Sequence, residues 1–301
     1  MTPLVSVVIP TFKRSEMLPR AINSVLNQTY NNVDVYVVDD NDPDTEFRKQ
    51  TEETMCQFEK NDRVHYIKHD HNRNGSAARN TGYRASQGDY IALLDDDDEF
   101  LPNKIEDQVK LLESLDDTWG ACYTKFIVVD GKKTIAKIGE TKEGNLLVDA
   151  LSRNLMLAAG SNLMIRRSIM DEMNGFDESF VRNQDLELLT RILFRYKLAC
   201  TNKEGLVIHA HKGFIVDFEA VTDRYKQTFA GFIGRLSTNE QKKVYDMINL
   251  QLFRYRLFSK RDVKSAFRMY KKREVNVWTS IRYIIHLIDR YITKERKGFN
   301  L

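Results

Sequence analysis

The sequence predicts an α/β domain with a mainly parallel sheet flanked by helices, followed by a helical C-terminal region. Two observations carry this prediction. Short runs rich in β-branched residues alternate with segments of helical periodicity through the first half of the chain. After residue 218 the chain becomes helical in pattern and rich in aromatic and basic residues. A soft boundary is therefore predicted near residue 215.

The individual elements follow from residue spacing. Short apolar runs that stop at Pro or Asp predict buried strands, whereas apolar residues that recur every three or four positions predict helices. These patterns predict strands over 5–9, 33–38, 63–68, 90–94, 119–129 and 162–165, and helices over 15–28, 76–86 and 185–196.

Composition excludes several classes of protein. A hydrophobic content of 42% and a charged content of 30% are ordinary for a globular chain and argue against disorder. The three cysteines are far apart and odd in number, so a disulfide framework is not expected and a reducing compartment is. No signal peptide and no apolar run of about 20 residues is recognised. We expect a cytoplasmic protein, with peripheral attachment to the inner face of the cell membrane as an alternative.

Charge is unevenly distributed along the chain. Residues 251–301 carry 14 Lys and Arg against 4 Asp and Glu, whereas the other 250 residues carry 32 against 39. Residues 277–301 combine apolar, aromatic and basic positions at helical spacing. Such a helix can lie on an anionic membrane surface, or pack on its own domain or in a homo-oligomer, and the pattern leaves these readings open. Nucleic-acid binding is not expected, because the body is acidic and carries no recognised nucleic-acid motif.

Polar clusters follow three of the predicted strands. They are Pro10-Thr11-Phe12, Asp39-Asp40 and the run from Asp95 to Asp98. Sheets of this class bind ligands beyond the carboxyl ends of their strands, so these clusters are candidates for one site. Four successive aspartates repel one another unless a cation such as Mg²⁺ or Mn²⁺ neutralises them, and a solvated acidic loop is the alternative. For the Asp39-Asp40 pair the alternative is ordinary turn chemistry.

Three further segments carry candidate residues. Arg79 follows small residues at a predicted helix start, which suits contact with phosphate, while Ser76 is a candidate cap of that helix. Asp185 begins another helix, where it can act as a cap or as a general base. His209 and His211 alternate as on one face of a strand and can be metal ligands or surface histidines.

Together these segments resemble the family 2 glycosyltransferases with the GT-A (Rossmann-like) fold. The resemblance covers about residues 4–195 and rests on the order and spacing of several motifs rather than on any one of them. The matching segments are VSVVIPTFKR, SVLNQTY, VDVYVVDDND, NGSAARNTGYRASQGDYIALLDDDDEF, GSNLMIRR and NGFDESFVRNQDLELLTRI.

The resemblance implies a nucleotide-sugar donor, a divalent cation and inversion at the anomeric carbon. It implies a catalytic domain over 1–215, with a nucleotide-sugar half over about 1–100 and an acceptor half over 101–215, followed by the helical, basic region 216–301. UDP is the default nucleotide, Mn²⁺ or Mg²⁺ the cofactor, and a glycan or lipid-linked glycan in surface-polysaccharide assembly the expected acceptor. The nucleotide-binding positions it implies are Pro10, Thr11, Phe12, Asp39, Asp40, Arg79, Asp95 and Asp96.

The resemblance also assigns the metal and the catalytic base. Its DxD signature falls on Asp95-Asp96-Asp97, with Asp97 as the direct metal ligand. Asp95 is a second metal candidate that lies closer to the ribose or sugar, and His211 is a further candidate. Asp98 extends the run, so the register of the ligands is open by one residue. The base falls on Asp185, although this chain carries Gln184 where the family commonly has Glu.

Two other classes of protein share some of these features. A nucleotidyltransferase also needs a nucleotide and a metal, and would release pyrophosphate instead of a nucleoside diphosphate. A non-catalytic module with an acidic pocket, such as a phospho-receiver domain, would use only about the first 120 residues. The segment around Asp185 would then have no role.

Overall fold

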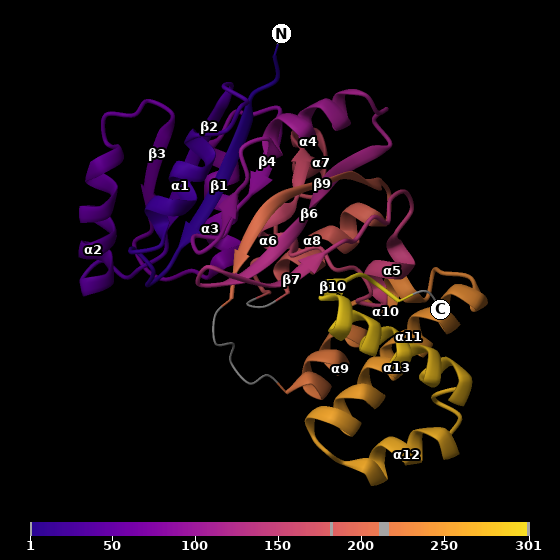
Figure 1. The fold of residues 1–301 in the computed structure, drawn as a ribbon. Coiled ribbons are helices and arrows are strands. Elements are labelled where there is room, and N and C mark those ends of the chain that lie inside the picture. Colours follow the sequence, from indigo (N-terminus) through magenta and orange to yellow (C-terminus); the bar gives the residue numbers. More distant parts are fainter. Residues whose placement is uncertain (1, 181–182, 211–216, 300–301) are drawn as a thin grey trace. The chain divides into compact units, whose positions relative to one another are not determined.

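The protein is described here by a computed structural model that covers residues 2–180, 183–210 and 217–299. The chain forms two compact units (Figure 1). The first contains residues up to 145 together with 157–210, and the second contains 146–156 together with the described residues from 217 onward. The predicted class, an α/β domain with a helical C-terminal extension, is confirmed.

A mixed sheet forms the centre of the first unit. Its strands are β1 (Val5–Thr11), β2 (Val33–Asp39), β3 (Val64–Lys68), β4 (Tyr90–Leu93), β5 (Glu99–Phe100), β6 (Trp119–Asp130), β7 (Lys133–Ile138), β8 (Met164–Arg166) and β9 (Lys197–His209). β3, β2, β1 and β4 lie side by side and parallel, and the sheet continues through β8, β6 and β7. β9 runs parallel to β6 along its other edge and also pairs with β5. The parallel half therefore brings the ends of β1, β2 and β4 to one edge.

Helices pack on this sheet. They are α1 (Leu18–Leu26), α2 (Glu46–Met55), the short 3₁₀ helix η1 (Cys56–Phe58), α3 (Gly75–Ala85), α4 (Lys104–Glu113), α6 (Ala159–Asn162), α7 (Arg167–Glu172) and α8 (Gln184–Leu193). α3 packs on β1 and β2, and α4 packs on β6 and β9. Gly82 permits the close approach of α3, because a Cβ there would lie 2.5 Å from Cγ1 of Val8.

Some local predictions differ from the structure. The sequence patterns did not signal α2, α4 or β7, nor the full length of β9. The strand predicted over 162–165 begins only at Met164, because Asn162 ends α6 and its amide oxygen accepts the backbone N–H of Thr124 at 3.0 Å. Asn74, not Ser76, caps α3, with its side chain accepting the N–H of Ser76 at 2.9 Å. Ser76 instead donates its hydroxyl to the carbonyl of Phe180.

The second unit is helical and has its own core. Its elements are α5 (Leu147–Leu151), α9 (Phe218–Thr228), α10 (Ala230–Ile233), α11 (Thr238–Arg254), the π-helical turn η2 (Tyr255–Ser259), α12 (Val263–Lys271), α13 (Val277–Thr293) and β10 (Glu295–Arg296). Leu151, Phe229, Ile248 and Met269 are buried together in this core. Among the described residues no helix has both the length and the apolar character needed to cross a bilayer.

Residues 146–156 belong to the second unit because their backbone is bonded there. The Tyr225 hydroxyl donates to the carbonyl of Ala150 at 2.8 Å, and the Gln251 amide donates to the carbonyl of Ser152 at 3.0 Å. Asn154 exchanges two hydrogen bonds with the backbone of Phe299, at 2.6 and 2.8 Å. Buried backbone groups need such partners, so this segment is fixed by residues far along the chain.

A buried lysine lies behind the sheet in the first unit. Lys104 on α4 is 1% exposed, and its Nζ lies 2.6 Å from Oε1 of Gln108 and 3.1 Å from the carbonyl oxygen of Asn162. Both partners are neutral. Burial lowers the pKa of Lys104 to about 7, because removal from water disfavours the ammonium form.

Replacement of Lys104 by Met is expected to change how stability depends on pH. The folded protein releases this proton near pH 7, whereas the unfolded chain keeps it up to its usual pKa of 10.5. The unfolded state therefore holds more protons between these values, and wild-type stability should rise with pH by up to about 1.4 kcal/mol per pH unit relative to Lys104→Met. Urea unfolding of both proteins across this range measures the difference.

The matched control is Lys110→Met. Lys110 lies on the same helix but is exposed and pairs with Glu106 at the surface. The difference between wild type and Lys110→Met should stay nearly constant from pH 7 to 10. If Lys104→Met behaved in the same way, Lys104 would be charged in the folded state throughout.

Candidate active site

A cleft opens where β1, β2 and β4 end. Its volume is about 410 Å³. Loops after these strands, the start of α3 and the start of α8 form its walls. The lining residues are Pro10, Thr11, Phe12, Arg14, Asp40, Asn72, Asn74, Gly75, Ala78, Arg79, Asp95, Asp96 and Gln184. The three polar clusters singled out in the sequence therefore meet at one place, as the parallel strand order requires.

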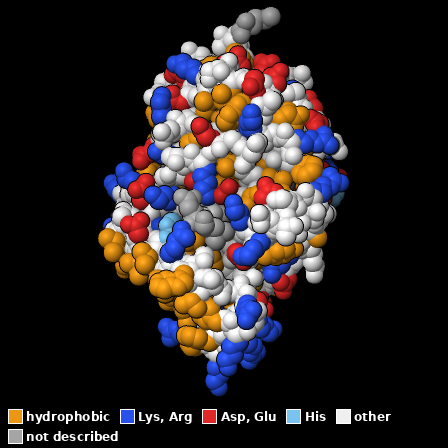
Figure 2. Space-filling view, turned by 90° about the vertical axis from the view of Figure 1, so that its right-hand side faces the viewer, with side chains coloured by type: hydrophobic (Ala, Val, Ile, Leu, Met, Phe, Trp, Pro, Cys, Tyr) orange, Lys and Arg blue, Asp and Glu red, His pale blue; other side chains and the backbone are white. Residues whose placement is uncertain are grey.

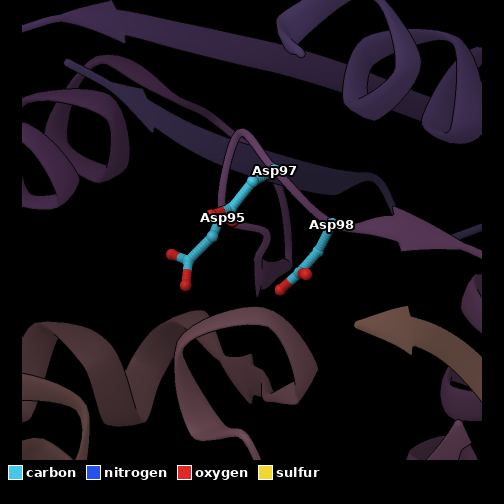
Figure 3. Close-up of side chains that lie close together, drawn as sticks. All are labelled: Asp95, Asp97 and Asp98. Atoms are coloured by element: carbon cyan, nitrogen blue, oxygen red, sulfur yellow. The ribbon is translucent and has the colours of Figure 1, made fainter. Parts of the chain in front are cut away.

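The acidic run forms the corner between β4 and β5 and is not a solvated loop. Asp96, Asp97 and Asp98 are only 4%, 8% and 5% exposed, and Asp95 is half-buried. Oxygen atoms of Asp95, Asp97 and Asp98 lie within 4.8 Å of one another. Figure 3 shows Asp95 and Asp98 extending from the corner to the same side. Three carboxylates in this arrangement form an oxygen ligand set suited to a hard divalent cation.

Basic and hydroxyl groups from distant segments hold the corner. Thr11 donates its hydroxyl to Oδ2 of Asp96 at 2.8 Å, and Ser161 donates to Oδ2 of Asp98 at 2.6 Å. Nη1 of Arg14 lies 3.2 Å from Oδ1 of Asp96, and the same guanidinium group pairs with Asp97. These partners come from the end of β1, from the loop after it and from α6, so the corner is fixed by the tertiary fold.

Burial leaves part of this negative charge uncompensated. Burial, together with the neighbouring Asp95 carboxylate, raises the pKa of Asp98 to about 8. Burial also raises the pKa of Asp96 to about 7, although Arg14 and the Thr11 hydroxyl act in the opposite direction. A raised pKa means that the ionised form of these carboxyl groups is disfavoured. A divalent cation bound beside them would stabilise the ionised form, so the corner suits such an ion.

Asp39 and Asp40 are adjacent but differ in environment. Asp39 has no exposed surface; its Oδ2 lies 3.0 Å from Nε of Arg48 and accepts the hydroxyl of Tyr66. Asp40 lines the cleft, and its Oδ1 lies 2.7 Å from Nδ1 of His69 and accepts the backbone N–H of Arg73 at 2.8 Å. The geometry gives Asp39 a role in holding the loop, whereas Asp40, which is only 3% exposed, lies in the wall of the cleft.

Arg79 connects the start of α3 to the acidic corner. It lies in the first turns of α3, is largely buried and pairs with Asp95. Gly160 makes room for this pair, because a Cβ at that position would lie 3.0 Å from Oδ2 of Asp95. The start of α8 is close by, since a Cβ at Gly75 would lie 3.1 Å from both Nη1 of Arg79 and Nε2 of Gln184.

Asp185 lies at the start of α8, next to the cleft-lining Gln184, and is half-buried. Asn183, in a left-handed conformation, is the residue before the helix, and its side chain makes no capping bond. Burial raises the pKa of Asp185, while Arg79 opposes this and Asp95 adds to it. A carboxylate with a raised pKa is a better proton acceptor near neutral pH, which is the property a general base requires.

The two histidine candidates have different positions. His209, at the end of β9, donates its backbone N–H to Oδ1 of Asp98 at 3.2 Å, and its ring Nε2 lies 3.7 Å from Oε1 of Glu99. His211 lies outside the described residues.

Several residues of the site were not singled out in the sequence. Arg14 and His69 matter because of what they contact across the fold, and neither stands in a pattern that marks it. Ser161 lies in the matched segment GSNLMIRR, and Gln184 stands where the family commonly has Glu. Neither position indicates that Ser161 bonds Asp98 or that Gln184 lines the cleft. Asp98 was left as a register alternative, and its oxygen belongs to the ligand group. Among these residues only Asp98 carried a local signal, the length of the aspartate run.

The fold and the cleft define an α/β domain with an acidic cleft of about 410 Å³ at its strand ends. Residues 6–173 match the family described as Glycosyl transferase family 2, which is more than half of the chain. The chain belongs to this family, and the resemblance seen in its motifs is confirmed.

Relatives carry related descriptions. An uncharacterized glycosyltransferase of Rickettsia felis is 31% identical over 196 residues, covering 64% of this chain and 31% of the relative. The amylovoran biosynthesis glycosyltransferase AmsB of Erwinia amylovora is 28% identical over 191 residues, covering 62% of each chain. The putative colanic acid biosynthesis glycosyl transferase WcaA of Escherichia coli is 39% identical over 104 residues, covering 34% and 36%. The matches span about a third of the Rickettsia felis and Rickettsia bellii relatives.

A solved structure shares the fold. The crystal structure of S. aureus TarS 1-349 in complex with UDP superimposes with a TM-score of 0.63 at 17% identity, covering 86% of this chain and 73% of that chain. At this identity the likeness establishes the GT-A fold and no more.

Asp39→Ala is expected to destabilise the protein strongly. Removal of this carboxylate leaves the buried guanidinium of Arg48 without its counter-charge, which typically costs about 3–5 kcal/mol. Chemical denaturation measures the loss in free energy of unfolding. Asp44→Ala, which removes an exposed carboxylate five residues away, should change stability by no more than about 0.5 kcal/mol. Equal effects of the two substitutions would contradict the structural role of Asp39.

Proposed function

We propose that this chain transfers a sugar from a nucleoside-diphosphate sugar to an acceptor hydroxyl, with inversion at the anomeric carbon. The observation that carries the proposal is a group of three carboxylates at the corner after β4. Asp97 and Asp98 are buried, whereas Asp95 is half-buried, lines the cleft and pairs with Arg79. Family membership supports the reaction class. The acceptor that we infer is a glycan or a lipid-linked glycan in surface-polysaccharide assembly, since AmsB and WcaA are described by amylovoran and colanic acid biosynthesis.

The donor binds, in this proposal, along the cleft wall formed by β1, β2 and α3. Pro10, Thr11 and Phe12 border the nucleotide, and Asp40 offers a carboxylate to a base N–H or a ribose hydroxyl. UDP is the proposed nucleotide because TarS structures of the same fold hold UDP and UDP-GlcNAc. Asp39 contributes indirectly, by holding the loop that carries Asp40.

Asp95, Asp97 and Asp98 are the proposed ligands of a divalent cation, Mn²⁺ or Mg²⁺. When bound, such an ion supplies positive charge to the leaving diphosphate. Arg79 adds a planar guanidinium that suits two phosphate oxygens, and Arg14 stands at the opposite side of the corner, paired with Asp96 and Asp97. Preorganised cationic groups of this kind stabilise the charge that develops as the donor bond breaks.

Asp185 is the proposed general base. It accepts the proton of the acceptor hydroxyl while that oxygen attacks the anomeric carbon from the face opposite the leaving diphosphate. One displacement of this kind inverts the configuration. The half-buried position of Asp185 and its raised pKa suit this role. Burial is the main cause of that rise, and the neighbouring Arg79 opposes it.

Nucleotide binding is tested by thermal unfolding with UDP, GDP, dTDP or CDP in the presence of Mn²⁺. A nucleotide at about 100 times its dissociation constant adds about 2.7 kcal/mol of stability, which should raise the Tm by ~5 °C or more. In Asp97→Asn most of the Mn²⁺-dependent part of this shift should disappear, because one of the three carboxylates is lost. Asp44→Asn, which alters an exposed carboxylate away from the cleft, should keep the wild-type shift.

Absence of a shift with every nucleotide, in Mn²⁺ and in Mg²⁺, would overturn the proposal. A shift that Asp97→Asn leaves unchanged would instead reject the ligand assignment. Release of pyrophosphate from a nucleoside triphosphate and a sugar phosphate would show a nucleotidyltransferase.

Asp185→Asn should bind the nucleotide as the wild type does but turn over poorly. Loss of a general base typically lowers the rate by about 10² to 10⁴. Metal-dependent hydrolysis of the nucleotide sugar selected by the binding screen measures turnover, and the Tm shift with UDP and Mn²⁺ checks binding. Asp177→Asn, in the exposed loop before α8, is the matched control and should retain both properties. Wild-type turnover in Asp185→Asn would contradict the assignment.

A further inference from the structure

α13 exposes a continuous apolar stripe. Trp278, Ile281, Ile285, Ile288 and Ile292 follow one another at spacings of three and four residues, which places them on one side of the helix. Their exposed fractions are 76%, 43%, 60%, 53% and 72%. Apolar side chains on a protein surface are normally scattered, so a stripe of five on one helix face marks an interaction surface.

The stripe is not the face by which α13 packs in its own unit. Ser280 and Tyr283 are buried, and Ile284 and Leu287 pack against the core of the second unit. The ring of Tyr283 meets the ring of Phe299 edge to face, with centroids 5.1 Å apart. Because a different face already anchors the helix, the stripe does not serve the folding of this unit.

A second exposed apolar pair lies on α12 in the same unit. Val263 and Phe267 are four residues apart, and each is at least half exposed. Lys264 and Arg268 directly follow them in the sequence. Hydrophobic side chains and Lys and Arg side chains are prominent in the lower part of Figure 2.

The charge of the region limits what can cover the stripe. Residues 251–301 carry 14 basic against 4 acidic residues. Arg282 and Asp289 both lie on α13 next to the stripe. Lys294, Glu295, Arg296 and Lys297 follow the helix, so basic residues remain in excess around it. A second copy of the chain would bring two such basic regions together, and their repulsion opposes that contact. An anionic surface meets the same charge with attraction.

We propose that the α13 stripe docks the C-terminal unit on a lipid surface that carries anionic headgroups. The isoleucines enter the boundary between headgroups and acyl chains, and the aromatic rings of Trp278 and Tyr291 lie at the headgroup level. Arg282 and the basic residues after the helix contact phosphate groups. Apolar insertion and basic attraction act together, and stable attachment of a peripheral protein generally needs two such contributions.

The test is co-sedimentation of the full chain with lipid vesicles, without nucleotide or metal. Binding should be strong to phosphatidylcholine vesicles containing about 30% phosphatidylglycerol, weak to pure phosphatidylcholine, and reduced when salt rises from ~0.1 M to ~0.5 M, because screening shortens the range of the attraction. The double substitution Ile285→Glu and Ile288→Glu should lower the affinity about tenfold or more. Both side chains are more than half exposed, so the variant is expected to fold.

Phe47→Glu provides the matched control. Phe47 is an exposed apolar residue on α2 in the first unit, and its replacement should leave vesicle binding unchanged. The fluorescence of Trp278 gives a second readout, since the chain has two tryptophans and the emission shift on vesicle addition should vanish in Trp278→Phe.

Equal binding of the double variant and the wild type would overturn the proposal, as would equal binding to neutral and anionic vesicles. A third outcome would also overturn the proposal. If the wild type sedimented as a dimer, the double variant as a monomer, and neither bound vesicles, a second copy of the chain would cover the stripe. These outcomes are independent of sugar transfer, because no substrate is present.

Discussion

Repulsion among buried carboxylates at the corner after β4 governs the organisation of the first unit. Oxygen atoms of Asp95, Asp97 and Asp98 lie within 4.8 Å of one another. Asp97 and Asp98 are almost closed to water, and Asp95 is half-buried. The fold offsets this charge with groups brought from elsewhere: the hydroxyls of Thr11 and Ser161 and the guanidinium groups of Arg14 and Arg79. The remaining imbalance, visible in the raised pKa of Asp98, makes the corner receptive to a cation.

The cleft depends on the same arrangement. Parallel pairing of β1 with β2 and β4 brings three loop starts to one edge, and the antiparallel pairing of β8 with β4 brings α6 beneath the acidic corner. Asp39 and Arg48 form a buried pair that holds the loop after β2, which leaves Asp40 to face the cleft. The side chains proposed to meet the donor are therefore supported by groups that the donor does not reach, and such support gives a binding site its precision.

The two faces of α13 in the second unit differ in their surroundings. One face of α13 completes a hydrophobic core that also includes Leu151 from the segment 146–156, and the other face remains apolar and exposed. A helix that served its own unit alone would have a polar outer face. The basic excess of the chain lies in this part of the sequence, away from the acidic residues of the cleft.

Short-range patterns in the chain were sufficient for the α/β class, the parallel strands β1 to β4, the helices α1, α3 and α8, the acidic run and the family. These features depend on periodicity and on residues close together in sequence. The partners of the acidic run were not predictable from the sequence. Arg14 reaches Asp97, and Ser161 reaches Asp98, only after strands distant in sequence have paired. Asp39 and Asp40 looked equivalent as neighbours, and burial against Arg48 distinguishes them. The place of residues 146–156 likewise follows from hydrogen bonds to residues that come about 75 to 145 positions later. Local sequence determines which backbone conformation is favoured, whereas burial and charge compensation are properties of segments that only folding brings together.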